Sequence, residues 1–203
     1  MKRRYVIGLT GGIASGKTTA AKILGELGAC IVDADKIGHE VLLKGTAAYK
    51  KIIDTFGEKF CDIDGEINRK ALGAYVFSHS DALERLNQIM HPEVEREARI
   101  QLDLADGIAV LDAALLFETG MDALCDSVWV VAVPQRIQCE RIIQRDGLTR
   151  REAMDRIRSQ MPTEEKIARA NCYIDGSGSV ENLKGKLRIL YAGIEKEWLE
   201  NKK

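Results

Sequence analysis

The amino-acid sequence predicts an α/β fold in which a doubly wound, parallel five-stranded sheet carries a helical insertion. Five short and nearly continuous apolar runs are typical of strands that are buried on both faces. Helical patterns separate these runs, and the alternation implies right-handed crossovers between parallel strands. Because ligands of such sheets bind at the carboxyl ends of the strands, the residues that follow each run are the first candidates for function.

The strands and helices are predicted from the apolar pattern and from local stop signals. Gly147 ends one helix, and Thr149 with Glu152 has the Thr-x-x-Glu spacing of a capping box that starts the next. The predicted strands are Tyr5–Leu9, Cys30–Val32, Ile108–Leu111, Val128–Val133 and Cys172–Ile174. The predicted helices outside the insertion are Thr18–Leu27, Asp35–Leu43, Gln135–Arg145 and one after Thr149.

The insertion is predicted between the second and third strands. Residues 46–106 contain no convincing central strand, and Asp64–Gly65 and His91–Pro92 are expected to break the chain there, so we predict an all-helical segment. Residues 1–45 and 107–203 then form the core, which includes a lid over about 136–162. A chain of 203 residues can bury one substantial core and a small inserted subdomain.

The composition argues against several classes of protein. Thirty Lys and Arg residues balance thirty-one Asp and Glu residues, so the global charge favours neither nucleic acid nor an anionic membrane as a partner. The five cysteines form no Cys-x-x-Cys pair, which argues against a disulfide framework or a zinc site and favours a reducing, cytoplasmic compartment. The apolar run after Met1–Arg4 is interrupted by Gly11–Gly12 and is too short for a signal peptide or a membrane span.

A phosphate-binding motif follows the first predicted strand. Residues Gly11–Thr18 have the full pattern G-x-x-x-x-G-K-[ST], and they open a helix as this motif requires. Its backbone N–H groups can surround phosphate oxygens, and the helix dipole adds positive potential there. We expect Lys17 to reach the β- and γ-phosphates of ATP, Thr18 to offer its hydroxyl to Mg²⁺, and Thr19 to contact the α-phosphate. The predicted ATP-binding residues are Gly12, Ile13, Ala14, Ser15, Gly16, Lys17, Thr18, Thr19 and, from the lid, Arg145.

The end of the third predicted strand favours phosphoryl transfer over hydrolysis. Hydrolytic P-loop ATPases usually place a water-activating glutamate beside the strand-end aspartate, but Asp112 is followed by Ala113 and Ala114. GTPases carry an Asn/Thr-Lys-x-Asp element, which this sequence lacks. The sequence therefore indicates a P-loop kinase-like protein with a hydroxyl or phosphate acceptor. Asp112 is a candidate metal residue that holds a Mg²⁺-bound water, or else an ordinary strand-end carboxylate.

Asp33 is the predicted general base. It follows the second predicted strand directly, at the edge of the sheet where the phosphate loop is expected. A carboxylate there can accept the proton of an attacking hydroxyl or orient that hydroxyl. The alternative is that Asp33 or Asp35 only caps the following helix.

An arginine-rich segment is the predicted lid. Arg141 and Arg145 are four residues apart on one helical face, so both guanidinium groups could close over the transferring phosphoryl group. Seven arginines cannot all reach one phosphate, so Arg141 is the preferred catalytic candidate and the alternative for the others is a solvated basic face. The arginines of the segment are Arg136, Arg141, Arg145, Arg150, Arg151, Arg156 and Arg158.

The sequence resembles the dephospho-CoA kinases over almost its whole length. Of the shared motifs, only the phosphate loop is general among P-loop proteins. The resemblance rests on Ile7–Ile13 leading into Ser15–Thr18, on Val32–Asp35, Asn68–Gly73, His91–Pro92 and Leu115–Gly120, on Gln138 with Arg141 and Arg145–Leu148, and on Arg156–Ile157 with Gln160–Pro162.

The resemblance implies a core, a lid and a helical CoA-binding domain in a cytoplasmic enzyme. It implies transfer of the γ-phosphate of ATP to the 3′-hydroxyl of the ribose of dephospho-CoA, with Asp33 as the base and with Lys17 and Arg141 as phosphate clamps. The alternatives are a surface role for Arg69, simple packing for Phe117 and helix capping before Pro92 for His91. The acceptor-binding residues that it implies are Thr10, Arg69, His91, Leu115, Phe117 and Glu118.

The sequence departs from the family pattern at three places. Ala114 stands where proline is typical, Asp175–Gly178 contains a glycine where asparagine is usual, and Arg169–Asn171 replaces the usual Ala-Asp. The first change should loosen the loop near the acceptor slightly, because proline would restrict that backbone. The other two affect a loop that we expect near the adenine.

Other functions are compatible with parts of the sequence. A kinase of another small molecule or of a nucleoside monophosphate could use the same phosphate loop, aspartate and arginine lid. A P-loop regulator or chaperone could bind ATP without transferring phosphate. We expect ATP and dephospho-CoA as substrates, Mg²⁺ as the only metal, no nucleic-acid or membrane partner, and a monomer or small homo-oligomer.

Overall fold

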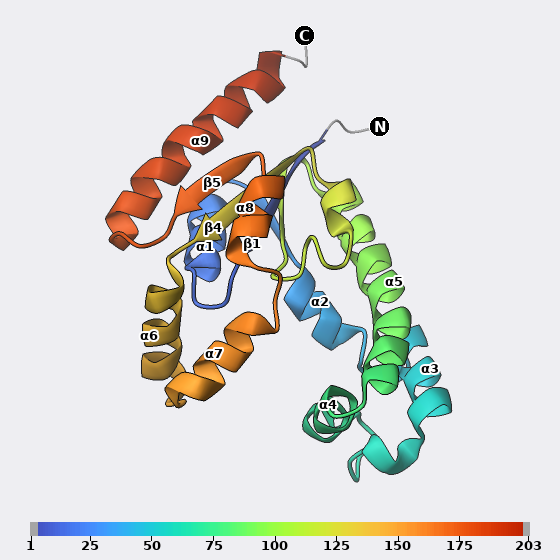
Figure 1. The fold of residues 1–203 in the computed structure, drawn as a ribbon. Coiled ribbons are helices and arrows are strands. Elements are labelled where there is room, and N and C mark those ends of the chain that lie inside the picture. Colours follow the sequence, from blue (N-terminus) through green and yellow to red (C-terminus); the bar gives the residue numbers. More distant parts are fainter. Residues whose placement is uncertain (1–3, 201–203) are drawn as a thin grey trace. The chain divides into compact units, whose positions relative to one another are not determined.

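The computed structural model describes residues 4–200, and its first structural unit is built on a five-stranded sheet (Figure 1). The strand order is β2-β3-β1-β4-β5. Strand β1 runs parallel to β3 and β4, and β4 runs parallel to β5. The predicted α/β class is confirmed, and each predicted strand is present with ends that differ by at most two residues. The strands are β1 (Arg4–Gly11), β2 (Cys30–Asp33), β3 (Gly107–Asp112), β4 (Ser127–Ala132) and β5 (Cys172–Asp175).

The helices lie between and after the strands. The capping box of Thr149 and Glu152 is present, and Gly147 ends a helix with a positive φ of 67°, as predicted. The α-helices are α1 (Lys17–Glu26), α2 (Ala34–Glu40), α3 (Ala47–Phe56), α4 (Arg69–Phe77), α5 (Ser80–Leu104), α6 (Gln135–Asp146), α7 (Arg150–Arg158), α8 (Thr163–Arg169) and α9 (Val180–Glu200). The 3₁₀ helices are η1 (Glu58–Phe60) and η2 (Met121–Leu124).

Helices α8 and α9 were not among the predicted elements. Leu183, Leu187 and Tyr191 of α9 are buried at a spacing of four residues, which is a helical pattern that the sequence contains. Figure 1 shows α9 beside α1, and the two helices contact each other. They form one hydrophobic cluster with the strands, to which Leu9 and Val131 contribute.

The opposite side of β1 is packed just as closely. A Cβ atom on Gly8 would lie 2.7 Å from Sγ of Cys125 and 2.9 Å from Cδ2 of Leu116. Both neighbours belong to the segment between β3 and β4, so this segment covers the sheet at a point where only glycine leaves room for it. Packing on both sides explains why the strand sequences are continuously apolar.

Contacts divide the chain into two units. One unit contains the described residues up to Val32 and from Gln101 onward, and the other is Asp33–Ile100. The second unit has its own apolar cluster, formed by Ile52, Phe56, Phe60, Ile67, Leu72, Val76 and Ala82. The predicted insertion boundaries, 46–106, and its role remain predictions. The first and last three residues of the predicted core lie outside the described residues.

The expected chain break at His91–Pro92 is wrong. Helix α5 continues from Ser80 to Leu104 with Pro92 inside it, and His91 is therefore not a helix cap. A proline removes one backbone donor, and in a helix of 25 residues the remaining hydrogen bonds and the packed face outweigh that loss. The expected break at Asp64–Gly65 is present as a turn, which leads into an isolated antiparallel bridge between Cys61 and Ile67.

The length and the apolar character of a helix decide whether it could span a membrane. Within residues 4–200, no helix is long and apolar enough to cross a membrane.

Candidate active site at the phosphate loop

The phosphate loop connects the end of β1 to the start of α1. Gly16 has a φ of 102° and precedes the first helical residue, and a side chain at this position would strain the backbone. Ala14 has a φ of 59°, which is uncommon for a residue other than glycine. Ser15 is buried, and its N–H donates to the carbonyl oxygen of Gly12 at 3.1 Å. The loop therefore has a fixed turn that directs its backbone toward the N-terminus of α1.

Two glutamines hold the same residue of the loop. The N–H of Ile13 donates to Oε1 of Gln160 at 3.0 Å, and Nε2 of Gln138 donates to the carbonyl oxygen of Ile13 at 3.1 Å. Gln138 is buried, and a Cβ atom on Gly12 would lie 2.3 Å from its Nε2 atom. Neither glutamine is a predicted site residue, although both belong to the motifs of the resemblance.

Arg141 of α6 joins the phosphate loop to the loop after β5. Its Nη1 atom donates to the carbonyl oxygen of Ala14 at 3.1 Å, and Nη2 donates to the carbonyl oxygen of Gly176 at 2.9 Å. These two loops are already in close contact, because a Cβ atom on Gly176 would lie 2.3 Å from the carbonyl oxygen of Ser15. The structure thus places Arg141 in direct contact with both the phosphate loop and the loop after β5.

The other predicted arginine, Arg145, lies in an ion-pair cluster on the segment predicted to be a lid. Its guanidinium group donates to both carboxylate oxygens of Asp146, at 2.7 and 3.0 Å, and Arg156 donates to Oδ2 of Asp146 at 2.9 Å. The hydrogen bonds from Arg145 lower the pKa of Asp146 from its usual value. Arg141 and Arg145 thus have different surroundings although they lie one turn apart.

Lys17 and Asp112 bring the ends of two neighbouring strands together. The register pairs Leu9 of β1 with Asp112, the last residue of β3. Nζ of Lys17 lies 2.6 Å from Oδ1 of Asp112, and the two side chains are only 13% and 8% exposed. Because either charge would be costly to leave unpaired with so little access to water, the pair holds the lysine at the carboxyl edge of the sheet.

The surroundings of Thr18, Thr19 and Asp112 indicate how a metal could bind. Among the described residues, no group of three or more His, Cys, Asp or Glu side chains could hold a metal ion alone. Mg²⁺ usually takes one or two protein ligands and completes its shell with waters and phosphates. An exposed Thr18 hydroxyl and the Asp112 carboxylate fit that type of site. Thr18 and Thr19 also line a shallow pocket with residues of α9.

Asp33 ends β2 and caps α2. Its Oδ1 atom accepts the backbone N–H of Lys36 at 2.9 Å, so the capping interaction is present at Asp33, whereas Asp35 lies in the first turn of the helix. Capping uses one carboxylate oxygen and fixes the orientation of the group. The role of Asp33 as a base stays a prediction.

The segment after β3 holds three of the predicted acceptor residues, Leu115, Phe117 and Glu118, and it contacts a fourth, Thr10 of β1. Thr10 is buried, and its hydroxyl donates to the carbonyl oxygen of Ala114 at 3.3 Å. Leu115 is 41% exposed, whereas Phe117 is buried with the guanidinium carbon of Arg169 at 4.4 Å from its ring centroid. The packing alternative therefore describes the surroundings of Phe117.

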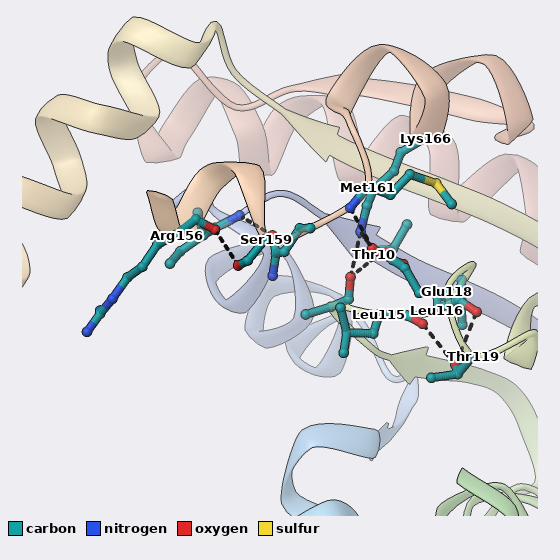
Figure 2. A network of polar contacts seen from close by, with 12 residues as sticks. Thr10, Leu115, Leu116, Glu118, Thr119, Arg156, Ser159, Met161 and Lys166 are labelled. Atoms are coloured by element: carbon teal, nitrogen blue, oxygen red, sulfur yellow. Dashed lines mark hydrogen bonds and ion pairs between the residues drawn. The ribbon is translucent and has the colours of Figure 1, made fainter. Parts of the chain in front are cut away.

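Glu118 belongs to a polar network in the same segment. Its Oε1 atom accepts the backbone N–H of Met161 at 3.0 Å and lies 2.9 Å from Nζ of Lys166 (Figure 2). No pattern in the sequence marks Lys166 as a buried residue, because lysine is almost never fully buried unless it is paired.

The family comparison adds to this geometry. A family model described as dephospho-CoA kinase matches residues 5–182. The chain belongs to the dephospho-CoA kinase family. This confirms the resemblance in the sequence and the expectation of an ATP-dependent kinase.

Individual relatives in the family match nearly the whole chain. A dephospho-CoA kinase of Carboxydothermus hydrogenoformans is 48% identical over 198 residues, which cover 95% of this chain and 96% of the relative. The solved structure of the Thermus thermophilus protein TT1252 has a TM-score of 0.82 at 33% identity, with coverage of 95% and 98%. The solved dephospho-CoA kinase of Campylobacter jejuni has a TM-score of 0.73 at 30% identity, with coverage of 96% and 99%.

The remaining residues that the family resemblance suggested lie in the second unit. Arg69 is the first residue of α4, which Asn68 caps, and its Nη2 atom lies 2.7 Å from Nε2 of His39. His91 lies within α5, where burial lowers its pKa. Their roles in acceptor binding stay predictions.

Proposed function

We propose that this chain transfers the γ-phosphoryl group of ATP to the 3′-hydroxyl of the ribose of dephospho-CoA, and so forms coenzyme A and ADP. The observation that carries the proposal is the Lys17–Asp112 pair beside a complete phosphate loop in a member of this family. An ammonium group at this position can move from the carboxylate to the β- and γ-phosphates while it stays within the site.

ATP binding in this proposal uses the phosphate loop. The N–H groups of Ala14 and Gly16, the dipole of α1 and Lys17 bind the phosphate oxygens. The Thr18 hydroxyl and the Asp112 carboxylate would hold Mg²⁺, Asp112 through a water. When bound, the ion would supply charge neutralisation for the transferring phosphoryl group.

Asp33 acts on the acceptor in this proposal. The bond from Lys36 anchors one oxygen of its carboxylate, and the second oxygen can orient the 3′-hydroxyl and take its proton. The anchored position supports this role, because a base with a fixed orientation loses less entropy on reaching the transition state.

Arg141 and Arg145 differ in the groups to which their guanidinium groups already donate. Arg141 has five N–H donors, and its bonds to Ala14 and Gly176 use two of them, so it can clamp a phosphate and keep the loops in place. Arg145 also uses two of its donors, but both go to the carboxylate of Asp146, whose negative charge offsets the charge that a phosphate would meet. We therefore keep Arg141 as the principal clamp.

The acceptor residues divide into two groups by exposure. The exposed side chain of Leu115 and the guanidinium group of Arg69 suit direct contact with apolar and phosphate parts of dephospho-CoA, while buried Thr10 and Phe117 shape the site from behind. The full proposed set is Thr10, Arg69, His91, Leu115, Phe117 and Glu118. We further propose that residues 46–106 bind the CoA portion and that a monomer or small homo-oligomer acts in the cytoplasm.

The test is the mass of the product. Purified protein is incubated with Mg-ATP and one acceptor at a time. The acceptors are dephospho-CoA, AMP, dTMP, CMP, gluconate and shikimate. We expect coenzyme A from the first acceptor and no phosphorylated product from the others. Transfer to another acceptor would show that the acceptor assignment is wrong, and transfer to none would favour a non-kinase P-loop protein.

A further inference from the structure

The ammonium group of Lys166 is sealed inside the first unit. Its side chain is 0% exposed, although it belongs to the short helix α8, whose other charged side chains are exposed or partly exposed. A buried ammonium group is unfavourable unless hydrogen bonds and an opposite charge compensate for the lost water. The partners of Lys166 therefore show what this charge stabilises.

Both partners lie in the loop after β3. Nζ of Lys166 donates to the carbonyl oxygen of Ala114 at 2.7 Å and pairs with Oε1 of Glu118 at 2.9 Å. The lysine thus holds the two ends of the segment that includes Leu115 and Phe117. Figure 2 shows its side chain pointing toward Thr10 and Glu118.

The same carboxylate oxygen holds the end of the lid. Oε1 of Glu118 accepts the backbone N–H of Met161, the residue after Gln160. Gln160 in turn accepts the N–H of Ile13 in the phosphate loop. One continuous set of hydrogen bonds therefore joins the loop after β3, the exit of the lid and the phosphate loop, and Lys166 is its buried cation.

Thr10 closes this network on the side of the sheet. Its hydroxyl donates to the Ala114 carbonyl oxygen that also accepts from Lys166. Both donors restrain a backbone position that directly precedes exposed Leu115. The bond from Lys166 is charge-assisted and its donor is fully buried, so the position of this loop depends on the lysine.

We propose that Lys166 is a positioning residue for phosphoryl transfer. It locks residues 114–118 and the lid exit at Gln160–Met161 into one arrangement, and so places the acceptor loop against the phosphate loop. It touches neither substrate. The inference rests on the proposed function, because it assigns the 114–118 segment to the acceptor side of the reaction.

The test compares Lys166→Met with the unmodified enzyme. Methionine fills the same volume without the charge, so Glu118 and the Ala114 carbonyl lose their buried partner. We expect kcat/KM for dephospho-CoA to fall about tenfold or more, because small misplacements of a reacting group have effects of this size. The dissociation constant of ATP should change by less than about threefold, since the bonds within the phosphate loop remain. Lys196→Met, on the exposed surface of α9, is the matched control and should behave like the unmodified enzyme.

Amide hydrogen exchange gives a second measurement. In the unmodified protein the N–H of Met161 should exchange slowly, and Lys166→Met should speed exchange in both 114–119 and 159–162. Unchanged exchange in either segment, or an equal loss in ATP and acceptor parameters, overturns the proposal. If the variant does not fold, fast exchange of Met161 in the unmodified protein is sufficient to overturn it, and slow exchange supports it. Failure of the unmodified protein to form coenzyme A would instead refute the proposed function, and the exchange data would still decide whether Lys166 holds the network.

Discussion

Two lysines form ion pairs at the end of β3, and they differ in their access to water. Lys17 is 13% exposed and pairs with Asp112, whereas Lys166 is 0% exposed and pairs with Glu118. A lysine that has to meet a phosphate needs a path to the ligand, while a sealed lysine can act only on the protein around it. The same kind of ion pair therefore serves ligand binding at Lys17 and the position of a loop at Lys166.

The largest effect is expected when the Lys→Met substitution is made at Lys17, the lysine that is partly exposed. Lys17→Met should lower kcat by about a hundredfold or more, because one positive group is lost from the developing charge of the transferring phosphoryl group. The loss should affect ATP and acceptor parameters together, unlike the selective effect expected for Lys166→Met. Steady-state kinetics with both substrates varied provides the measurement. Near-normal turnover of Lys17→Met would remove the contrast between the two lysines.

Asp33 tests whether a carboxylate can serve the fold and the chemistry together. Asparagine caps helices about as well as aspartate, so Asp33→Asn should keep the melting temperature. It should lower kcat by about a hundredfold, because the amide cannot take a proton. Thermal unfolding and turnover at saturating substrates are measured on the same sample. If turnover persists, Asp33 is a cap and nothing more.

Gln160, which accepts a hydrogen bond from the phosphate loop, extends the comparison to a neutral side chain. Gln160→Ala removes the acceptor of the Ile13 N–H, and ATP affinity should fall by about fivefold, the cost of one ordinary hydrogen bond. Titration with a fluorescent ATP analogue measures the effect. Gln144→Ala, at an exposed position of α6, is the control and should leave affinity unchanged. Equal affinities for all three proteins would mean that the loop keeps its shape without this bond.

An exposed pair provides the smallest expected effect. The pKa of Asp146 is lowered by Arg145, so the pair stabilises the folded state at neutral pH and the contribution disappears as the pH falls through that lowered pKa. Asp146→Asn should therefore lower the melting temperature slightly at pH 7 and not at all in strong acid. Thermal unfolding across acidic pH measures the difference. A difference in melting temperature between the two proteins that stays constant down to strong acid would indicate an effect of packing and not of charge.

The sequence was sufficient for the features that depend on neighbouring residues. The continuous apolar strands, the phosphate loop and the capping box of Thr149 are local patterns, and they appear in the structure where the sequence predicted them. The family resemblance was also carried by short motifs.

Other features depend on contacts between distant residues. Lys166 lies 52 positions from its partner Ala114, and nothing in the sequence of α8 marks the lysine as buried. The continuity of α5 through Pro92 depends on its packed face, which outweighs a local signal for a break. The contacts of Arg141 and Gln138 with the phosphate loop likewise require α6 to fold against that loop.

Gly176 lies where the loop after β5 closely contacts the phosphate loop. Its φ is not in the left-handed region, so glycine is needed here for space alone, against the carbonyl oxygen of Ser15. An alanine Cβ there would lie 2.3 Å from that oxygen, so one of the two loops would have to shift. A directed-evolution library aimed at nucleotide preference should therefore keep Gly176 and vary Ser177 and Gly178, because a Cβ on Gly178 would meet only the side chain of Asn182, at 3.3 Å.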